Sequence, residues 1–185
     1  MKTETHWKLA LKILRQDMAE APFKSRLAFV FGCIKPDFDI FSYLRGFKKK
    51  PFYGHNWNNA ENYIMHLSQK AEQRNLGSFG FGLLVHYLCD AFTFAHNEGF
   101  SGGLKAHAVY EKQLHTSLLE NCKKTEVFHS GASAELSKVI EDVHLRYMNL
   151  PNTVFKDIEF IDLAVSFAVA TWKSTVYSAC ECEKR

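Results

Sequence analysis

An apolar segment at residues 79–95 (FGFGLLVHYLCDAFTFA) is the feature that most constrains the fold. Its length and its lack of proline favour a buried helix over a strand. Asp90 lies inside this segment, and a buried carboxylate is costly unless it meets a cation or several hydrogen-bond donors. No Lys or Arg occurs in residues 75–104, but His86 precedes Asp90 by four residues. On a helix both side chains project from one face, so they can share one bound cation.

The same spacing recurs at His107 and Glu111. With 9 His and 20 acidic residues in 185, about one such pair is expected by chance. The position of both pairs in one short, partly apolar segment is therefore more informative than the spacing itself. His96 lies between the pairs, beside residues that end helices and would let the chain turn back: Asn97, Gly99, Gly102 and Gly103. The alternative is two ion pairs on helix faces plus a core histidine.

The order His-x3-Asp-x5-His, followed after a gap by His-x3-Glu, resembles the zinc-dependent phospholipase C family, which shares its fold with fungal single-strand-specific nucleases. The resemblance implies an all-α fold, a bundle of about six to seven helices around a cluster of two or three zinc ions. It implies that His86 and Asp90 bind a first ion, with Asp90 bridging to another. It places His96, His107 and Glu111 at a separate ion.

The resemblance also suggests a metal ligand near the amino terminus. His6 stands in a Thr-His pair that opens the first expected helix, and a His in this region binds metal in the family. There, a tryptophan at the start of the chain adds its amine and carbonyl; the nearest tryptophan here, Trp7, is internal. His6 and Asp90 are thus candidates for a third site. Considered alone, His6 could equally be a solvated or capping histidine.

Two further candidates precede the central segment. FGCIKPDFD resembles the Gly-x-x-x-Pro-Asp element of the family, in which the aspartate binds the first metal and is a proposed general base; Asp37 is the match and Asp39 the reserve. His55 matches a family histidine by order alone. Asp37 and His55 would therefore join His86 and Asp90 around one ion. Without the resemblance, Asp37 could instead cap a short helix after Pro36.

The segment at residues 46–54 (GFKKKPFYG) joins two of these candidates and should lie at the rim of the site. Basic residues next to aromatic ones suit an anionic lipid surface or a phosphate-bearing substrate, although such runs are more often solvated loops. The rim candidates are Lys48, Lys49, Lys50, Phe52 and Tyr53.

Composition bounds the class of protein. A chain of 185 residues with 46% hydrophobic residues is most simply one globular domain, residues 1–185. A net charge of +3 gives no strong nucleic-acid signal. Five cysteines without a framework spacing suggest a reducing compartment. Residues 1–20 are too charged for a signal peptide, and the longest apolar run is shorter than the ~20 residues of a membrane span, so we expect a cytoplasmic protein.

Hydrophobic periodicity predicts the remaining helices. Glycines at 77, 80 and 82 open the central helix and either allow close helix packing or only lower its stability. The expected helices begin near Thr3, at Phe23 (ending before Pro36), near Asn56, at Lys105, at Ala134 (ending before Pro151) and near Val154.

Two rival metal sites fit less well. The pairs Glu126-x-x-His129 and Glu141-x-x-His144 resemble di-iron bundle motifs, but the stretch between them is too short for two long helices. HD-type phosphohydrolases need an adjacent His-Asp pair, and the sequence has none.

The resemblance therefore implies a metal-dependent phosphodiesterase that splits a phospholipid into diacylglycerol and a phosphorylated head group. The ligand types suit zinc best, and iron or manganese accept them too. The ions would lower the pKa of a bound water to ~7, and Asp37 could take its proton. The alternatives are a nuclease or phosphatase on the same scaffold, or a non-catalytic metal-stabilised helical protein.

Overall fold

The computed structural model describes residues 1–38, 57–120 and 135–182, and within these ranges the secondary structure is entirely helical. The all-α prediction, with about six to seven helices, is confirmed. The described elements are α1 (Thr3–Asp17), α2 (Phe23–Phe38), α4 (Trp57–Glu72), α5 (Ser78–Ala91), the 3-10 helix η1 (Phe94–His96), α6 (Leu104–Glu120), α7 (Leu136–Met148) and α8 (Val154–Cys182).

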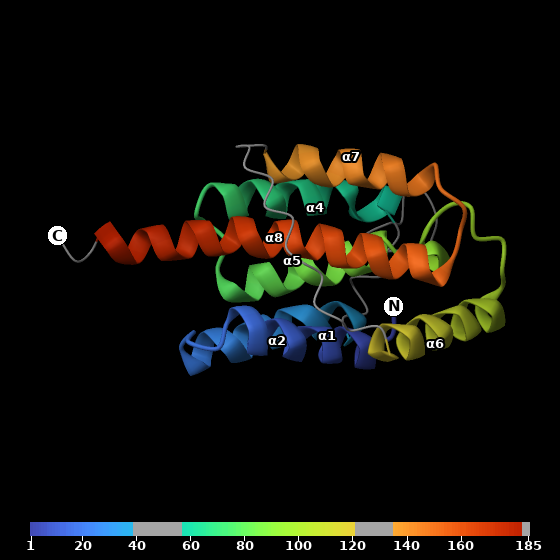
Figure 1. Cartoon of the computed structure of the whole chain (residues 1–185), viewed down its shortest axis with the longest axis horizontal. Helices are drawn as coiled ribbons and strands as arrows, with labels where there is room; N and C mark the ends of the chain where they lie inside the picture. The colour runs from blue at the N-terminus through green and yellow to red at the C-terminus, as the bar shows by residue number, and fades with distance from the viewer. Residues whose placement is uncertain (39–56, 121–134, 183–185) are drawn as a thin grey trace.

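Helix α5 forms the centre of the bundle. It contacts α1, α2, α4 and α8, and α8 runs across it with α1 and α2 on one side and α4 and α7 on the other (Figure 1). Residues 84–91 of α5 are all buried, which explains why this helix is apolar on every face. His86 and Asp90 are both 0% exposed, so the prediction of a carboxylate inside a buried helix is confirmed.

Helices α2 and α5 approach each other closely because glycines meet at their contact. A Cβ atom on Gly82 would overlap the carbonyl oxygen of Phe29 and lie 2.9 Å from the Cα of Gly32. The glycines were expected either to allow close helix packing or only to lower the stability of the helix, and at Gly82 the structure shows close packing. The approach brings the end of α2 beside His86.

The expected end of the second helix before Pro36 was wrong, because α2 continues through Pro36 to Phe38. Pro36 lies in the last turn, where its ring fixes a helical φ and its missing N–H removes only one helical hydrogen bond. Asp37 is consequently part of α2.

The apolar segment at residues 79–95 was expected to form a single helix, but the structure divides it into two. Helix α5 ends at Ala91 and η1 follows after a turn. The amide of Asn97 holds this turn, since its Nδ2 donates to the carbonyls of Ala91 (2.8 Å) and Thr93 (2.9 Å). No helix in the described ranges is long and apolar enough to cross a membrane.

Candidate metal centre

A first cluster joins α1 to α5. His6, His86 and Asp90 are buried, and one potential ligand atom of each lies within 4.8 Å of the other two. His86 Nε2 is 3.2 Å from Asp90 Oδ2, and His6 Nε2 is 3.3 Å from Asp90 Oδ1. The imidazole rings of His6 and His86 stack with centroids 3.9 Å apart. His6 therefore lies with the first pair of the sequence motif, on the opposite carboxylate oxygen from His86.

The backbone of α2 orients His86. Nδ1 of His86 is 2.8 Å from the carbonyl oxygen of Cys33, an acceptor that requires the proton to be on Nδ1. Nε2 then faces the carboxylates of Asp37 and Asp90. A histidine whose second nitrogen is fixed in this way is the usual form of a metal ligand.

Asp37 lies beside the first cluster, and its Oδ1 is 3.9 Å from His86 Nε2. Its Oδ2 and the Nε2 of His6 are buried atoms that form no hydrogen bond among the described residues. Buried polar atoms whose hydrogen bonding is incomplete are costly, and a bound cation would satisfy both. The predicted fourth member, His55, lies outside the described residues, as do Asp39 and the rim candidates Lys48, Lys49, Lys50, Phe52 and Tyr53.

A second cluster joins η1 to α6. His96, His107 and Glu111 again place one potential ligand atom each within 4.8 Å of the others. Glu111 Oε1 is 3.2 Å from the Nε2 atoms of both histidines. All three are partly buried, so this cluster is more open than the first. These are the three residues that the family resemblance placed at a separate ion.

The amino group of Met1 lies between the two clusters and was not among the predicted site groups. The nitrogen is 2.5 Å from Asp90 Oδ1, 3.1 Å from Glu111 Oε1 and 2.7 Å from His96 Nε2. Burial lowers the pKa of this amine, but the charges of Asp90 and Glu111 outweigh burial and raise the pKa to about 10. A positive charge is thus held where the ligands of both clusters converge. The resemblance implied an amino-terminal amine at this place, but from a tryptophan, and Met1 supplies the amine here.

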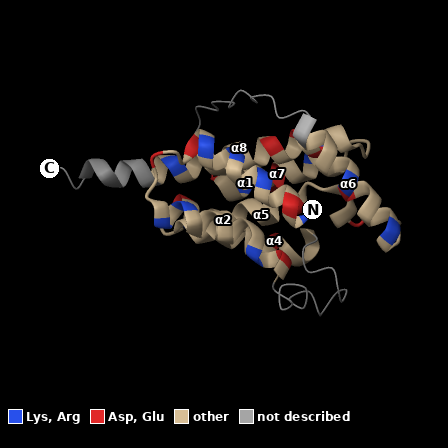
Figure 2. Cartoon of the chain, turned by 90° about the horizontal axis from the view of Figure 1, so that it is seen from below, with Lys and Arg blue, Asp and Glu red and all other residues tan. Residues whose placement is uncertain are grey.

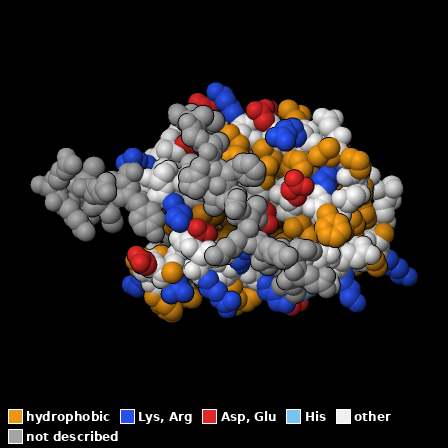
Figure 3. Space-filling view, in the orientation of Figure 1, with side chains coloured by type: hydrophobic (Ala, Val, Ile, Leu, Met, Phe, Trp, Pro, Cys, Tyr) orange, Lys and Arg blue, Asp and Glu red, His pale blue; other side chains and the backbone are white. Residues whose placement is uncertain are grey.

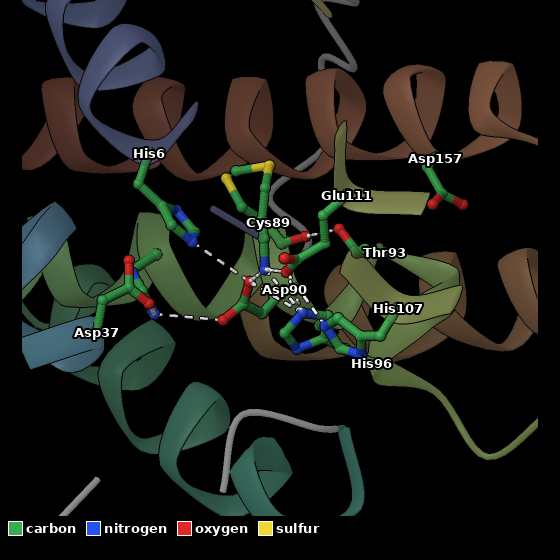
Figure 4. A network of polar contacts seen from close by, with 12 residues as sticks. His6, Asp37, Cys89, Asp90, Thr93, His96, His107, Glu111 and Asp157 are labelled. Atoms are coloured by element: carbon green, nitrogen blue, oxygen red, sulfur yellow. Dashed lines mark hydrogen bonds and ion pairs between the residues drawn. The ribbon is translucent and has the colours of Figure 1, made fainter. Parts of the chain in front are cut away.

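The charge states of the cluster side chains suit metal binding, whereas the Met1 ammonium opposes a second cation at this point. Burial and the neighbouring His86 lower the pKa of His6 to about 3, while burial and the Met1 ammonium lower that of His96 to about 4. Burial opposes ionisation of Asp90, but the Met1 ammonium and nearby histidines bring its pKa well below the usual value. Neutral imidazoles and ionised carboxylates are the forms that bind cations. Figure 4 shows both clusters converging on Asp90.

A buried carboxylate outside the clusters, Asp157, holds the second cluster's elements together. It accepts hydrogen bonds from the backbone N–H of Phe94 (2.9 Å), the hydroxyl of Tyr110 (2.8 Å) and the hydroxyl of Tyr147 (2.7 Å). These donors belong to η1, α6 and α7, so one carboxylate of α8 joins three other elements. Asp157 was not among the predicted residues, although it lies four residues before the apolar Ile161, on the same face of the helix.

The rival di-iron motifs are not brought together in the described structure. Glu126 and His129 lie outside the described residues, and Glu141 is exposed on α7. His144 is buried by packing, since its ring stacks on Trp57 with centroids 3.6 Å apart. Its Nε2 is 3.3 Å from Asn97 Oδ1, which connects it to the turn after α5.

Together these features define a helical protein with two adjoining groups of candidate metal ligands, of the histidine and carboxylate type that zinc prefers. Residues 5–154 match the family described as zinc dependent phospholipase C, which is most of the 185-residue chain. The chain belongs to this family. Family membership supports zinc as the metal and a phospholipase C-type hydrolase as the general class. Comparisons with curated proteins and with solved structures found no match.

Proposed function

We propose that this protein is a zinc-dependent phosphodiesterase that cleaves a phospholipid to diacylglycerol and a phosphorylated head group. The observation that carries the proposal is the convergence of two candidate ligand clusters on one buried carboxylate, Asp90, in a chain of this family. Asp90 Oδ1 lies 4.0 Å from His96 Nε2 of the second cluster, so it can connect the two sites. Adjoining cations are the arrangement used for in-line displacement at phosphorus.

The residues divide into two proposed sets. His6, His86 and Asp90 would hold one ion, with Asp37 at its edge, and the second cluster would hold another. When bound, zinc supplies the Lewis acidity that makes water nucleophilic and neutralises charge on a phosphate ester. Asp37 would accept the proton of the attacking water through its unpartnered Oδ2.

The first experiment combines metal content with hydrolysis of a soluble short-chain phospholipid. His86→Ala and Asp90→Asn remove members of the first cluster, and each should lose bound zinc and reduce phosphodiesterase activity about a hundredfold or more. His66→Ala is the matched control, because His66 is an exposed histidine on α4, and this variant should retain both. Unchanged metal content in both cluster variants would refute the proposal.

A substrate panel separates the alternatives on the same scaffold. The proposal predicts release of a phosphorylated head group from phospholipid. Turnover of single-stranded nucleic acid or of a phosphomonoester instead would assign a nuclease or a phosphatase. A protein that binds zinc, loses stability with chelator and turns over none of these would have a structural metal only.

A further inference from the structure

One face of α2 carries large hydrophobic side chains that stay more than half exposed among the described residues. Phe23 is 72% exposed, Leu27 54%, Phe31 55% and Phe38 70%. Their spacing of four, four and seven residues places all four on one side of a helix. We call these four residues the α2 stripe.

The opposite face of α2 already has its partner. Phe29 and Cys33 are 0% exposed and belong to the core that α2 forms with α5. A helix that is satisfied on its inner face normally presents polar residues to water, and a contiguous exposed apolar face is characteristic of an interaction surface. In Figure 3, hydrophobic and basic side chains lie together along the lower edge, where Figure 1 places α1 and α2.

The charges on α2 indicate which kind of partner its exposed face would contact. Lys24, Arg26 and Lys35 are its basic residues, and its one acidic residue, Asp37, points toward the metal-ligand cluster (Figure 4). The charge that α2 itself presents outward is therefore positive. Figure 2 shows where Lys, Arg, Asp and Glu lie along the ribbons. Phenylalanine and leucine bordered by basic side chains form the pattern of a helix lying in an anionic lipid interface. A second copy meeting this face would bring like charges together, which disfavours self-association.

The α2 stripe also ends at the candidate site. Phe38 directly follows Asp37, whose Oδ1 is 3.9 Å from His86 Nε2. One helix thus carries an exposed apolar face and a candidate catalytic carboxylate at the same end.

We propose that the outer face of α2 docks the protein on an anionic lipid surface and so presents phospholipid head groups to the metal centre. The second half of this statement rests on the proposed phospholipase function, whereas the docking itself does not.

The test is co-sedimentation of the full chain with vesicles, either phosphatidylcholine alone or phosphatidylcholine with phosphatidylserine. The double variant Phe23→Gln/Leu27→Gln should bind the mixed vesicles at least about tenfold more weakly, because it removes two apolar side chains from the interface. Lys24→Gln should weaken binding about fivefold, and only to vesicles that contain phosphatidylserine. The matched control is Leu145→Gln/Phe155→Gln, whose residues are 58% and 69% exposed on other helices and whose binding should be unchanged.

Hydrolysis of a soluble short-chain phospholipid separates docking from catalysis. The stripe variant should keep this activity and its metal content while losing activity on vesicles. Wild-type binding to vesicles without hydrolysis of soluble lipid would overturn the proposed function and leave the docking surface standing. Equal losses in the stripe and control variants, or no vesicle binding by the wild type, would overturn the docking proposal. So would light scattering that shows a dimer which the stripe variant dissociates.

Discussion

Asp157 allows a direct comparison of two hydroxyl groups that donate to one buried carboxylate. Tyr110 Oη donates at 2.8 Å and Tyr147 Oη at 2.7 Å, but Tyr110 lies on α6 next to Glu111, whereas α7 carries no member of either cluster. A hydrogen bond to a carboxylate contributes about 1.5–3 kcal/mol. Tyr110→Phe and Tyr147→Phe should therefore each lower the free energy of unfolding by about that amount.

Only one of the two substitutions should change metal binding. Tyr110→Phe releases α6 from Asp157 and should weaken binding at the second cluster about tenfold, the effect typical of losing an outer support of a ligand. Tyr147→Phe should leave that affinity unchanged. Urea denaturation measures the stability, and competition with a chromogenic zinc chelator measures the affinity. Equal affinity losses in both variants, or none in Tyr110→Phe, would refute the positioning role of this network.

Three further predictions concern packing, pH and metal removal. Gly82→Ala should lower the free energy of unfolding by about 1–3 kcal/mol, because the new methyl group overlaps the carbonyl oxygen of Phe29. Gly77→Ala is the control: no atom lies within 4 Å of its new methyl group, so the free energy of unfolding should change by less than about 0.5 kcal/mol. Urea denaturation measures both. Burial, assisted by the charge of Lys156, lowers the pKa of His144 to about 4 from 6.5, so the unfolded chain takes up the proton first and stability falls as pH drops between these values. Between about pH 7 and about pH 5, His144 should cost the protein about 2 kcal/mol of its free energy of unfolding. His144→Phe keeps a ring stacked on Trp57 but cannot take up a proton, so its free energy of unfolding should fall by correspondingly less than that of the wild type. Denaturation at the two pH values measures the difference. Zinc at about 100 times its dissociation constant should raise the free energy of unfolding by about 3 kcal/mol over chelated protein, and a midpoint that does not respond to chelator would contradict metal binding to the folded state.

The pairs within single helices could be predicted from spacing. His86 and Asp90 were expected to share a face of a buried helix, and they lie 3.2 Å apart; His107 and Glu111 repeat this geometry. Helical periodicity alone places such residues together, because positions i and i+4 adjoin in every α-helix. The absence of Lys and Arg from the surrounding sequence then limited which cation Asp90 could meet.

The contacts between helices could not be obtained from spacing. His6 reaches Asp90 only because α1 and α5 belong to one bundle, and from the residues alone His6 could be either a ligand or a solvated histidine. Asp37 was expected after a helix that ended at Pro36, since proline usually interrupts helices, but a proline in the last turn is tolerated. The amine of Met1 is a backbone group, and the donors to Asp157 lie 10 to 63 residues away along the chain, so neither produced a local pattern.

The most direct test of the central claim is the zinc content of protein purified without a His tag and without added metal, measured by inductively coupled plasma mass spectrometry. The two clusters predict at least two equivalents that survive dialysis, falling in Asp90→Asn. Substoichiometric metal that dialyses away, with Asp90→Asn indistinguishable from wild type, would instead mean that these histidines and carboxylates pair only with one another.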